Sequence, residues 1–167
     1  AAIRAVAEVE TKRDSFDEVG RPTILYERHY FARISGGGFN RTHPDISNGS
    51  AGGYGRFSAQ YPKLTRAATL NESAALQSAS WGMFQIMGAN HAAAGHATVA
   101  AFVDAMMTGP AAHLAAFVAF IQTSPALTRA LRDKNWADFA RGYNGPGYAR
   151  NNYDVEMRNA YQRHAGR

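Results

Sequence analysis

AIRAVAEVETK (residues 2–12) is the stretch that decides how the rest of the chain is interpreted, because it predicts a helix with a glutamate near its end. Ile3 and Val6 share helical spacing with Glu10, and neither proline nor glycine interrupts the run. At about 100° per residue, Glu10 lies about 20° from Ile3, whereas Glu8 lies about 140° away. We therefore expect Glu10 on the apolar face of this helix and Glu8 in solvent.

A small β region is predicted after this helix. The segment TILYERHYF (residues 23–31) is rich in β-branched and aromatic residues, which predicts a strand over at least its first half; the second half can be helical. Glycine, asparagine and serine dominate residues 36–55, which indicates a long irregular loop or a short hairpin. The β region should therefore lie near residues 20–58.

Helical patterns fill most of the remaining chain. We predict helices over residues 63–79, 81–93, 97–107, 111–123, 125–133, 135–142 and 149–164. Ser124 before Pro125 is suited to cap one of these helices, and Asn135 is suited to cap the next. The sequence therefore predicts an α+β fold that is mostly helical.

Composition fits one globular domain over residues 1–167, since this length suits a single core and 46% of the residues are hydrophobic. The chain has no cysteine, so neither disulfides nor thiol chemistry is expected. No apolar run is long enough for a membrane span, and no export signal is visible. The chain begins at Ala1 without methionine, which leaves open that it is a fragment of a longer protein.

Glu10 is our candidate general acid. General acid catalysis needs a carboxylic acid that stays protonated near neutral pH, and apolar burial raises the pKa of a carboxyl group in that direction. The structural alternative is a helix-end glutamate paired with Lys12, Arg13 or another arginine. Periodicity alone does not choose between these interpretations.

Three motifs point to a known superfamily. Val9-Glu10-Thr11 before a turn resembles the Glu-Ser motif of goose-type lysozymes and lytic transglycosylases, with Thr11 in place of the commoner serine. SWGMFQIM (residues 80–87) resembles their glycine, apolar, glutamine motif, and YNG (residues 143–145) resembles the third motif. More closely, AVAEVET, GRPTILYERHYF, SWGMFQIMG and RGYNGPGY together resemble the N-acetylmuramidase domain of phage endolysins over nearly the whole chain.

This resemblance implies a lysozyme-like fold with a substrate cleft between the β region and the helices. It implies that Glu10 is the acid, that Gln85 and Asn144 hydrogen-bond the sugars or order the active-site backbone, and that Tyr143 lines the cleft. Trp81 can belong to the core or can stack on a sugar ring, and we include it among the substrate-binding candidates.

A second carboxylate is harder to assign. Glycosidases normally place two acids across the bond, and Glu27 is our candidate. If residues 23–31 form a strand, Glu27 shares a face with Leu25 and His29 and can point into the cleft. A structural salt bridge is the competing interpretation. Asp14 and Glu18 are weaker candidates, and the goose-type resemblance allows that a second acid is absent.

Other site classes find little support. His91 and His96 are five residues apart and do not share a helical face, so we expect no metal site and no cofactor. A net charge of +5 favours an anionic partner, and basic residues crowd the last third of the chain. We interpret them as solvated helix faces and expect no nucleic-acid partner; the rival hypothesis is a non-catalytic module that binds an anionic surface.

We therefore predict a hydrolase that cleaves the β-1,4 bond between N-acetylmuramic acid and N-acetylglucosamine during phage-induced lysis. The alternative is a lytic transglycosylase, which leaves 1,6-anhydro-muramic acid ends. The expected partner is bacterial peptidoglycan, with electrostatic contact to the anionic envelope. We expect a monomer that accumulates in the host bacterial cytoplasm and acts on the cell wall after release.

Overall fold

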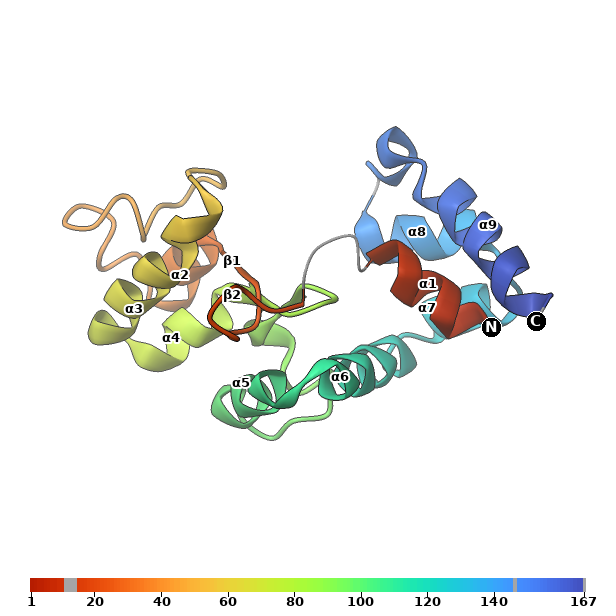
Figure 1. Ribbon diagram of the computed structural model, residues 1–167. Helices are drawn as coiled ribbons and strands as arrows, with labels where there is room; N and C mark the ends of the chain where they lie inside the picture. The colour runs from red at the N-terminus through yellow and green to blue at the C-terminus, as the bar shows by residue number, and fades with distance from the viewer. Residues whose placement is uncertain (11–14, 146, 167) are drawn as a thin grey trace.

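The computed structural model describes residues 1–10, 15–145 and 147–166, and its elements form two groups connected by a pair of helices (Figure 1). In chain order the elements are α1 (Ala2–Glu10), β1 (Ile24–Tyr26), α2 (Arg28–Ile34), η1 (Phe57–Ala59), α3 (Gln60–Leu70), α4 (Glu72–Gln77), β2 (Ala79–Trp81), β3 (Ile86–Met87), η2 (Gly88–Asn90), α5 (Val99–Thr108), α6 (Pro110–Gln122), α7 (Pro125–Arg132), α8 (Trp136–Asn144), η3 (Tyr148–Asn151) and α9 (Tyr153–Ala165). The small sheet lies with α2, α3 and α4 in one group, and α1 lies with α7, α8 and α9 in the other. The predicted α+β fold, mostly helical, is confirmed.

The two ends of the chain lie together, because the N-terminal helix α1 packs along the C-terminal helix α9. Helix α1 also contacts α7. Its buried residues are Ala5, Val6 and Val9. Ile3 is 37% exposed, so the buried stripe is rotated from the one that the sequence predicts. Glu8 is exposed, as predicted, and Glu10 ends the helix at the edge of its buried face.

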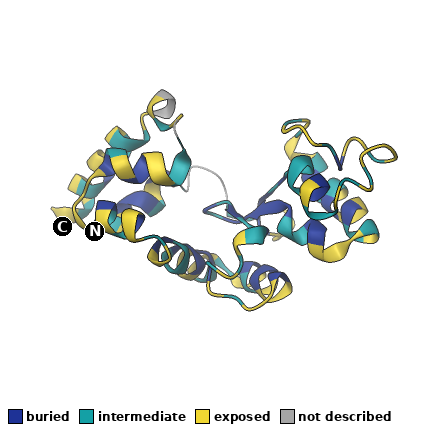
Figure 2. Ribbon diagram, turned by 180° about the vertical axis from the view of Figure 1, so that it is seen from behind, coloured by how far each residue is buried: buried dark blue, intermediate teal, exposed yellow. Residues whose placement is uncertain are grey.

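The sheet is antiparallel, with the strand order β1-β2-β3. Trp81 of β2 pairs with Ile24 of β1 on one side and with Ile86 of β3 on the other. The strands are largely buried, as the dark blue segments near the centre of Figure 2 show. Two of the three strands therefore come from residues that follow the predicted β region.

The predicted helix over residues 81–93 is wrong, because β2, a turn, β3 and η2 occupy this stretch. Gly82 and Gln85 have positive φ angles of 68° and 49°, which an α-helix does not permit. Pairing with β1 therefore overrides a helical spacing of apolar residues. Gly88 allows close packing here, since a Cβ atom at this position would lie 2.1 Å from the carbonyl oxygen of Leu76.

Residues 23–31 change from strand to helix at Glu27. Strand β1 ends at Tyr26 and α2 begins at Arg28, so the helical alternative for the second half is confirmed. The prediction that Glu27 and His29 share a strand face is wrong. Side chains return to the same face every two residues in a strand but every 3.6 residues in a helix, and the chain changes from strand to helix here.

The helices that follow lie close to their predicted positions, with one exception. The predicted helix 63–79 is divided at Asn71, whose extended backbone ends α3 and whose side chain accepts from Ala74 N–H at the start of α4. Ser124 and Asn135 cap α7 and α8 as predicted, each accepting a backbone N–H in the first turn.

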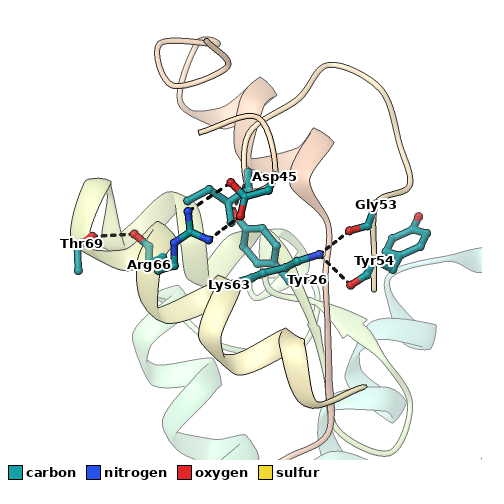
Figure 3. Close-up of polar contacts among 8 residues, drawn as sticks. Tyr26, Asp45, Gly53, Tyr54, Lys63, Arg66 and Thr69 are labelled. Carbon is teal, nitrogen blue, oxygen red and sulfur yellow. Dashed lines mark hydrogen bonds and ion pairs between the residues drawn. The ribbon is translucent and has the colours of Figure 1, made fainter. Parts of the chain in front are cut away.

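The predicted irregular loop lies between α2 and η1 and is attached to α3 by charged side chains (Figure 3). Arg66 binds Asp45 at 2.5 Å. Lys63 donates to the carbonyl oxygens of Gly53 and Tyr54, with a distance of 2.8 Å to Tyr54. These contacts hold the loop on its own group of elements.

Buried apolar side chains from both groups and from the connecting helices α5 and α6 form one connected cluster. Within the described residues, none of the individual helices combines the length and the apolar character that a membrane span requires. Helices α6 and α7 pass that test only together, and the chain bends by 107° between them.

Candidate active site

A cavity of about 420 Å³ lies where α1, α8 and the β2–β3 hairpin meet. One side, which we call the helix wall, consists of Glu10, Tyr143 and Asn144. The opposite side, the hairpin wall, consists of residues 83–87. Val9, Asn90, Phe120 and Tyr153 complete the lining. The structure thus brings together four of the residues that the sequence nominates, namely Glu10, Gln85, Tyr143 and Asn144.

Two helix ends meet in the helix wall, because Glu10 is the last residue of α1 and Asn144 is the last residue of α8. Gly145 follows with a φ of 83°, a conformation that glycine adopts readily at helix ends. Asn144 Nδ2 donates to Glu10 Oε1 at 3.0 Å. Glu10 is the only carboxylate among the described residues that line the cavity.

Asn144 offers a further polar atom. Its Oδ1 is buried and has no hydrogen-bond partner among the described residues. Buried polar atoms are normally paired, and the described residues supply no partner for this amide oxygen.

Tyr143 joins the two walls. Its hydroxyl donates to the carbonyl oxygen of Phe84 in the hairpin at 3.0 Å. Its ring packs against Phe117, Phe120 and Phe139, with ring centroids 5.3, 6.2 and 5.8 Å away. Burial raises the pKa of Tyr143, and the charge of Glu10 adds to that shift. The hydroxyl therefore stays protonated and continues to donate.

Gln85 holds the hairpin wall from within. Its Oε1 accepts from the hydroxyl of Ser80 at 2.9 Å. Its Nε2 donates to the carbonyl oxygens of Gly82 and Thr23 at 2.8 and 3.2 Å. Since these contacts are all to the protein, they favour ordering of the active-site backbone over contact with a sugar.

The nomination of Trp81 as a sugar-stacking residue is wrong for this structure. Trp81 is 1% exposed, and its indole N–H donates to the carbonyl oxygen of Leu76 at 3.1 Å. No face of the ring is accessible, so Trp81 belongs to the core, which was the alternative interpretation.

Glu27 is also not where the second acid was expected. Among the described residues it does not line the cavity of Glu10. Its carboxylate lies 3.2 Å from His29 Nδ1 and accepts a hydrogen bond from Tyr54. The structural salt bridge is therefore the interpretation that these contacts favour, because the turn from β1 into α2 directs Glu27 to its own group of elements.

Two weaker candidates for the second acid were Glu18 and Asp14. Glu18 lines a neighbouring cavity of about 590 Å³ that shares only Gln85 with the first, among described residues. Asp14 and Thr11 lie outside the described residues, and so do Lys12 and Arg13, the alternative partners predicted for Glu10.

The chain matches the Muramidase family, described as N-acetylmuramidase, over residues 1–165. It belongs to the N-acetylmuramidase family. The predicted resemblance and the predicted enzyme class, a glycoside hydrolase of the muramidase type, are thereby confirmed.

A solved structure extends this result. The chain is similar to the crystal structure of the Burkholderia AP3 phage endolysin, with 44% sequence identity and a TM-score of 0.93. The match covers 98% of this chain and 64% of the endolysin, so this chain spans less than two thirds of that protein. No curated protein matches the chain in sequence.

Some residues of this candidate site were missed by the sequence analysis. Phe120, Asn90 and Tyr153 line the cavity, and His113 supports the hairpin wall from behind. A single histidine in the otherwise apolar segment PAAHLAAFVAFIQ (residues 110–122) was a usable signal, since a buried imidazole requires hydrogen-bond partners.

Among the described residues of the muramidase chain, no cluster of three or more histidine or acidic side chains is arranged to hold a metal ion. From the described residues, the cavity offers one carboxylate, one amide that contacts it, and the ordered hairpin wall. Such a set can transfer a proton to a bound ligand.

Proposed function

We propose that this domain cleaves the β-1,4 bond between N-acetylmuramic acid and N-acetylglucosamine in bacterial peptidoglycan, with Glu10 as the general acid. The observation that carries the proposal is the position of Glu10, which stands at the end of α1 as the only described carboxylate in the cavity. Its contact with Asn144 at 3.0 Å fixes the carboxyl group to the end of α8, which also lines the cavity.

The reaction begins with Glu10 protonated. Glu10 gives its proton to the glycosidic oxygen, the bond from C1 of N-acetylmuramic acid to that oxygen breaks, and N-acetylglucosamine leaves with a 4-hydroxyl group. The muramic acid carbon becomes oxocarbenium-like and is captured by water. That water returns a proton to the carboxylate of Glu10, which restores the acid.

Asn144 positions the acid in this proposal. Its Nδ2 donates to Glu10 Oε1 at 3.0 Å. Gln85 and Tyr143 act on the protein itself, since Gln85 orders the hairpin and Tyr143 fixes the Phe84 carbonyl.

Among the described residues, no carboxylate other than Glu10 lines the cavity, so the proposed reaction uses no protein nucleophile from them. Glu27 is held by His29 and Tyr54, and Glu18 lines the other cavity. Water therefore attacks directly, or the acetamido group of the substrate assists. Capture by the 6-hydroxyl of muramic acid instead of water would make the same site a lytic transglycosylase.

The similar endolysin and the net charge of this chain support a biological setting for the proposed reaction. Similarity to a phage endolysin supports release of this protein from the host cytoplasm to lyse the cell wall. A net charge of +5 supports contact with the anionic envelope. We propose that residues 1–167 form one catalytic domain and act as a monomer.

Product analysis tests this function. Purified peptidoglycan is digested with the protein, the products are reduced with borohydride, and the muropeptide ends are identified by mass spectrometry. We expect reducible N-acetylmuramic acid ends with the wild type and none with Glu10→Gln. Ends with 1,6-anhydro-muramic acid would show transglycosylation, and reducible N-acetylglucosamine ends would contradict the proposed bond.

A further inference from the structure

His113 is a buried histidine behind the hairpin wall and does not line the cavity of Glu10. It is 1% exposed and lies in α6, among apolar side chains. Its Nδ1 accepts from the backbone N–H of Met83 at 3.1 Å, and its Nε2 lies 2.7 Å from the carbonyl oxygen of Met106. Because a carbonyl oxygen only accepts and a backbone N–H only donates, the ring is neutral with its proton on Nε2.

The hairpin turn is shaped to receive this imidazole. Gly82 has a φ of 68°, and a Cβ atom there would lie 2.7 Å from Cε1 of His113. The ring also stacks on Phe16, which precedes β1, with ring centroids 5.1 Å apart. Any other residue at position 82 would displace the imidazole, so the turn and the ring form one packed unit.

Three hydrogen bonds lead from His113 to the acid. His113 holds the backbone N–H of Met83, and the next residue, Phe84, offers its carbonyl oxygen to the hydroxyl of Tyr143. Asn144 follows Tyr143 in α8 and donates to Glu10. The position of the Met83 peptide therefore determines how the hairpin wall meets the helix wall.

We propose that His113 is a positioning residue of the active site, whose neutral imidazole holds the Met83–Phe84 backbone in register with Tyr143. The inference rests on the proposed function of Glu10 and adds a residue outside the cavity to it. His113 does not touch substrate, and it acts through the hairpin.

Protonation of His113 abolishes this arrangement. A proton on Nδ1 would point at the N–H of Met83. Nδ1 could then no longer accept the hydrogen bond from Met83, because both groups would be donors. Burial lowers the pKa of His113, and the bond to the Met106 carbonyl partly offsets this shift. The pKa of the folded state therefore lies below that of the unfolded state. The contribution of the neutral ring is present above the unfolded pKa and is lost as pH falls through the folded pKa.

Among the described residues no charged side chain contributes to this shift. The elements packed on the ring present Phe16 before β1, Gly82 and Met83 from the hairpin, and Met106 from α5. The titratable neighbour of Phe16 is Asp17, which is bound to Arg21. The acid side of the activity profile should therefore report the ionisation of His113.

Two substitutions separate the ring nitrogens. His113→Asn keeps an acceptor near the position of Nδ1 and cannot take up a proton, whereas His113→Gln keeps a polar group near Nε2 and removes the acceptor for Met83. Phe102→Leu, in the buried face of α5, is the control for general loss of packing. For each protein kcat and KM on peptidoglycan are measured between pH 4 and pH 8, and circular dichroism confirms the folded state at each pH.

We expect His113→Gln to lower kcat about tenfold at neutral pH, the equivalent of one positioning hydrogen bond, with little change in KM. His113→Asn should retain more activity and should lose the fall in kcat at acid pH that the wild type and Phe102→Leu show. The NMR titration of His113 in the wild type should have its midpoint at that fall, which tests the inference even if a variant fails to fold.

A different set of results would overturn the inference. The acid fall in kcat persisting in folded His113→Asn, or an NMR midpoint of His113 away from that fall, would show that His113 only fills space. An inactive wild type would overturn the proposed function together with this inference, whereas an active wild type with either of those results overturns this inference alone.

Discussion

The helix wall and the hairpin wall of the cavity are built in different ways. The helix wall presents side chains at helix ends, and its two polar partners, Glu10 and Asn144, are 134 residues apart in the chain. The hairpin wall consists of consecutive residues, whose backbone is held from within by the Gln85 side chain and from behind by His113. In the proposed function, the helix wall supplies the reacting group and the hairpin wall determines the shape of the cavity. Substitution of Glu10 in the helix wall should change rate more than stability, whereas substitutions in the hairpin wall, or at the Tyr143 contact between the walls, should change both.

The largest effect is expected for Glu10→Gln. The amide keeps the size of the side chain and can accept from Asn144, but it cannot donate a proton as a carboxylic acid does. The rate of peptidoglycan cleavage should fall by about 10²- to 10⁴-fold, the usual contribution of a general acid, with little change in melting temperature. Glu8→Gln is the matched control on the same helix, since Glu8 is exposed and binds Arg163 and His164 at the surface. Its cleavage rate should stay near that of the wild type.

A smaller effect on rate and a larger effect on stability are expected for Gln85→Leu. The change removes three hydrogen bonds that connect β1, β2 and the turn, so the free energy of unfolding should fall by about 2 kcal/mol and the rate by about tenfold. Chemical denaturation and cleavage assays measure the two quantities. Gln77→Leu, which removes one exposed hydrogen bond to Ser73, should leave both nearly unchanged. Equal losses in the two variants would show that Gln85 does not support the wall.

Tyr143→Phe tests the contact between the walls. Loss of the bond to the Phe84 carbonyl should lower the free energy of unfolding by about 1 kcal/mol and the cleavage rate by about fivefold. Tyr26→Phe is a matched control, because the Tyr26 hydroxyl donates to the carbonyl oxygen of Ile46 at 2.9 Å, away from Glu10. Tyr26→Phe should lower the free energy of unfolding by a similar amount and should leave the cleavage rate unchanged. If both variants lose activity equally, the contact between the walls has no special role.

The smallest effect is expected for Glu27→Gln. Glu27 contacts His29 and Tyr54 on its own group of elements, and its ion pair involves a histidine at partial exposure. The cleavage rate should therefore change by less than about twofold, as is usual for a weak ion pair. A loss that approaches that of Glu10→Gln would restore Glu27 as the second acid.

Much of the helix wall could be predicted from the sequence. Helical periodicity placed Glu10 and Glu8 on different sides of α1, and caps such as Asn135 located the start of α8. Periodicity missed the exact buried stripe, because α1 packs on α9 through Ala5, Val6 and Val9. Contacts between the two ends of the chain are not visible in a local pattern.

The sequence identified the motif that forms the hairpin wall, but it did not predict that this motif folds as a hairpin. The apolar spacing of residues 81–87 suits a helix, and only pairing with β1 and positive φ at Gly82 and Gln85 make it a hairpin. The failure for Glu27 has a similar cause, since a change from strand to helix at one residue redirects its side chain. Burial of Trp81 likewise depends on tertiary packing that the sequence does not reveal.

The most direct test of Glu10 as the acid uses a substrate that needs no acid. A 2,4-dinitrophenyl glycoside of the N-acetylglucosaminyl-N-acetylmuramic acid disaccharide has a leaving group that departs without protonation. Wild type and Glu10→Gln are compared on this glycoside and on peptidoglycan. We predict that Glu10→Gln loses about 10²- to 10⁴-fold on peptidoglycan and less than about tenfold on the glycoside. Equal losses on both substrates would contradict the assignment of Glu10 as the proton donor.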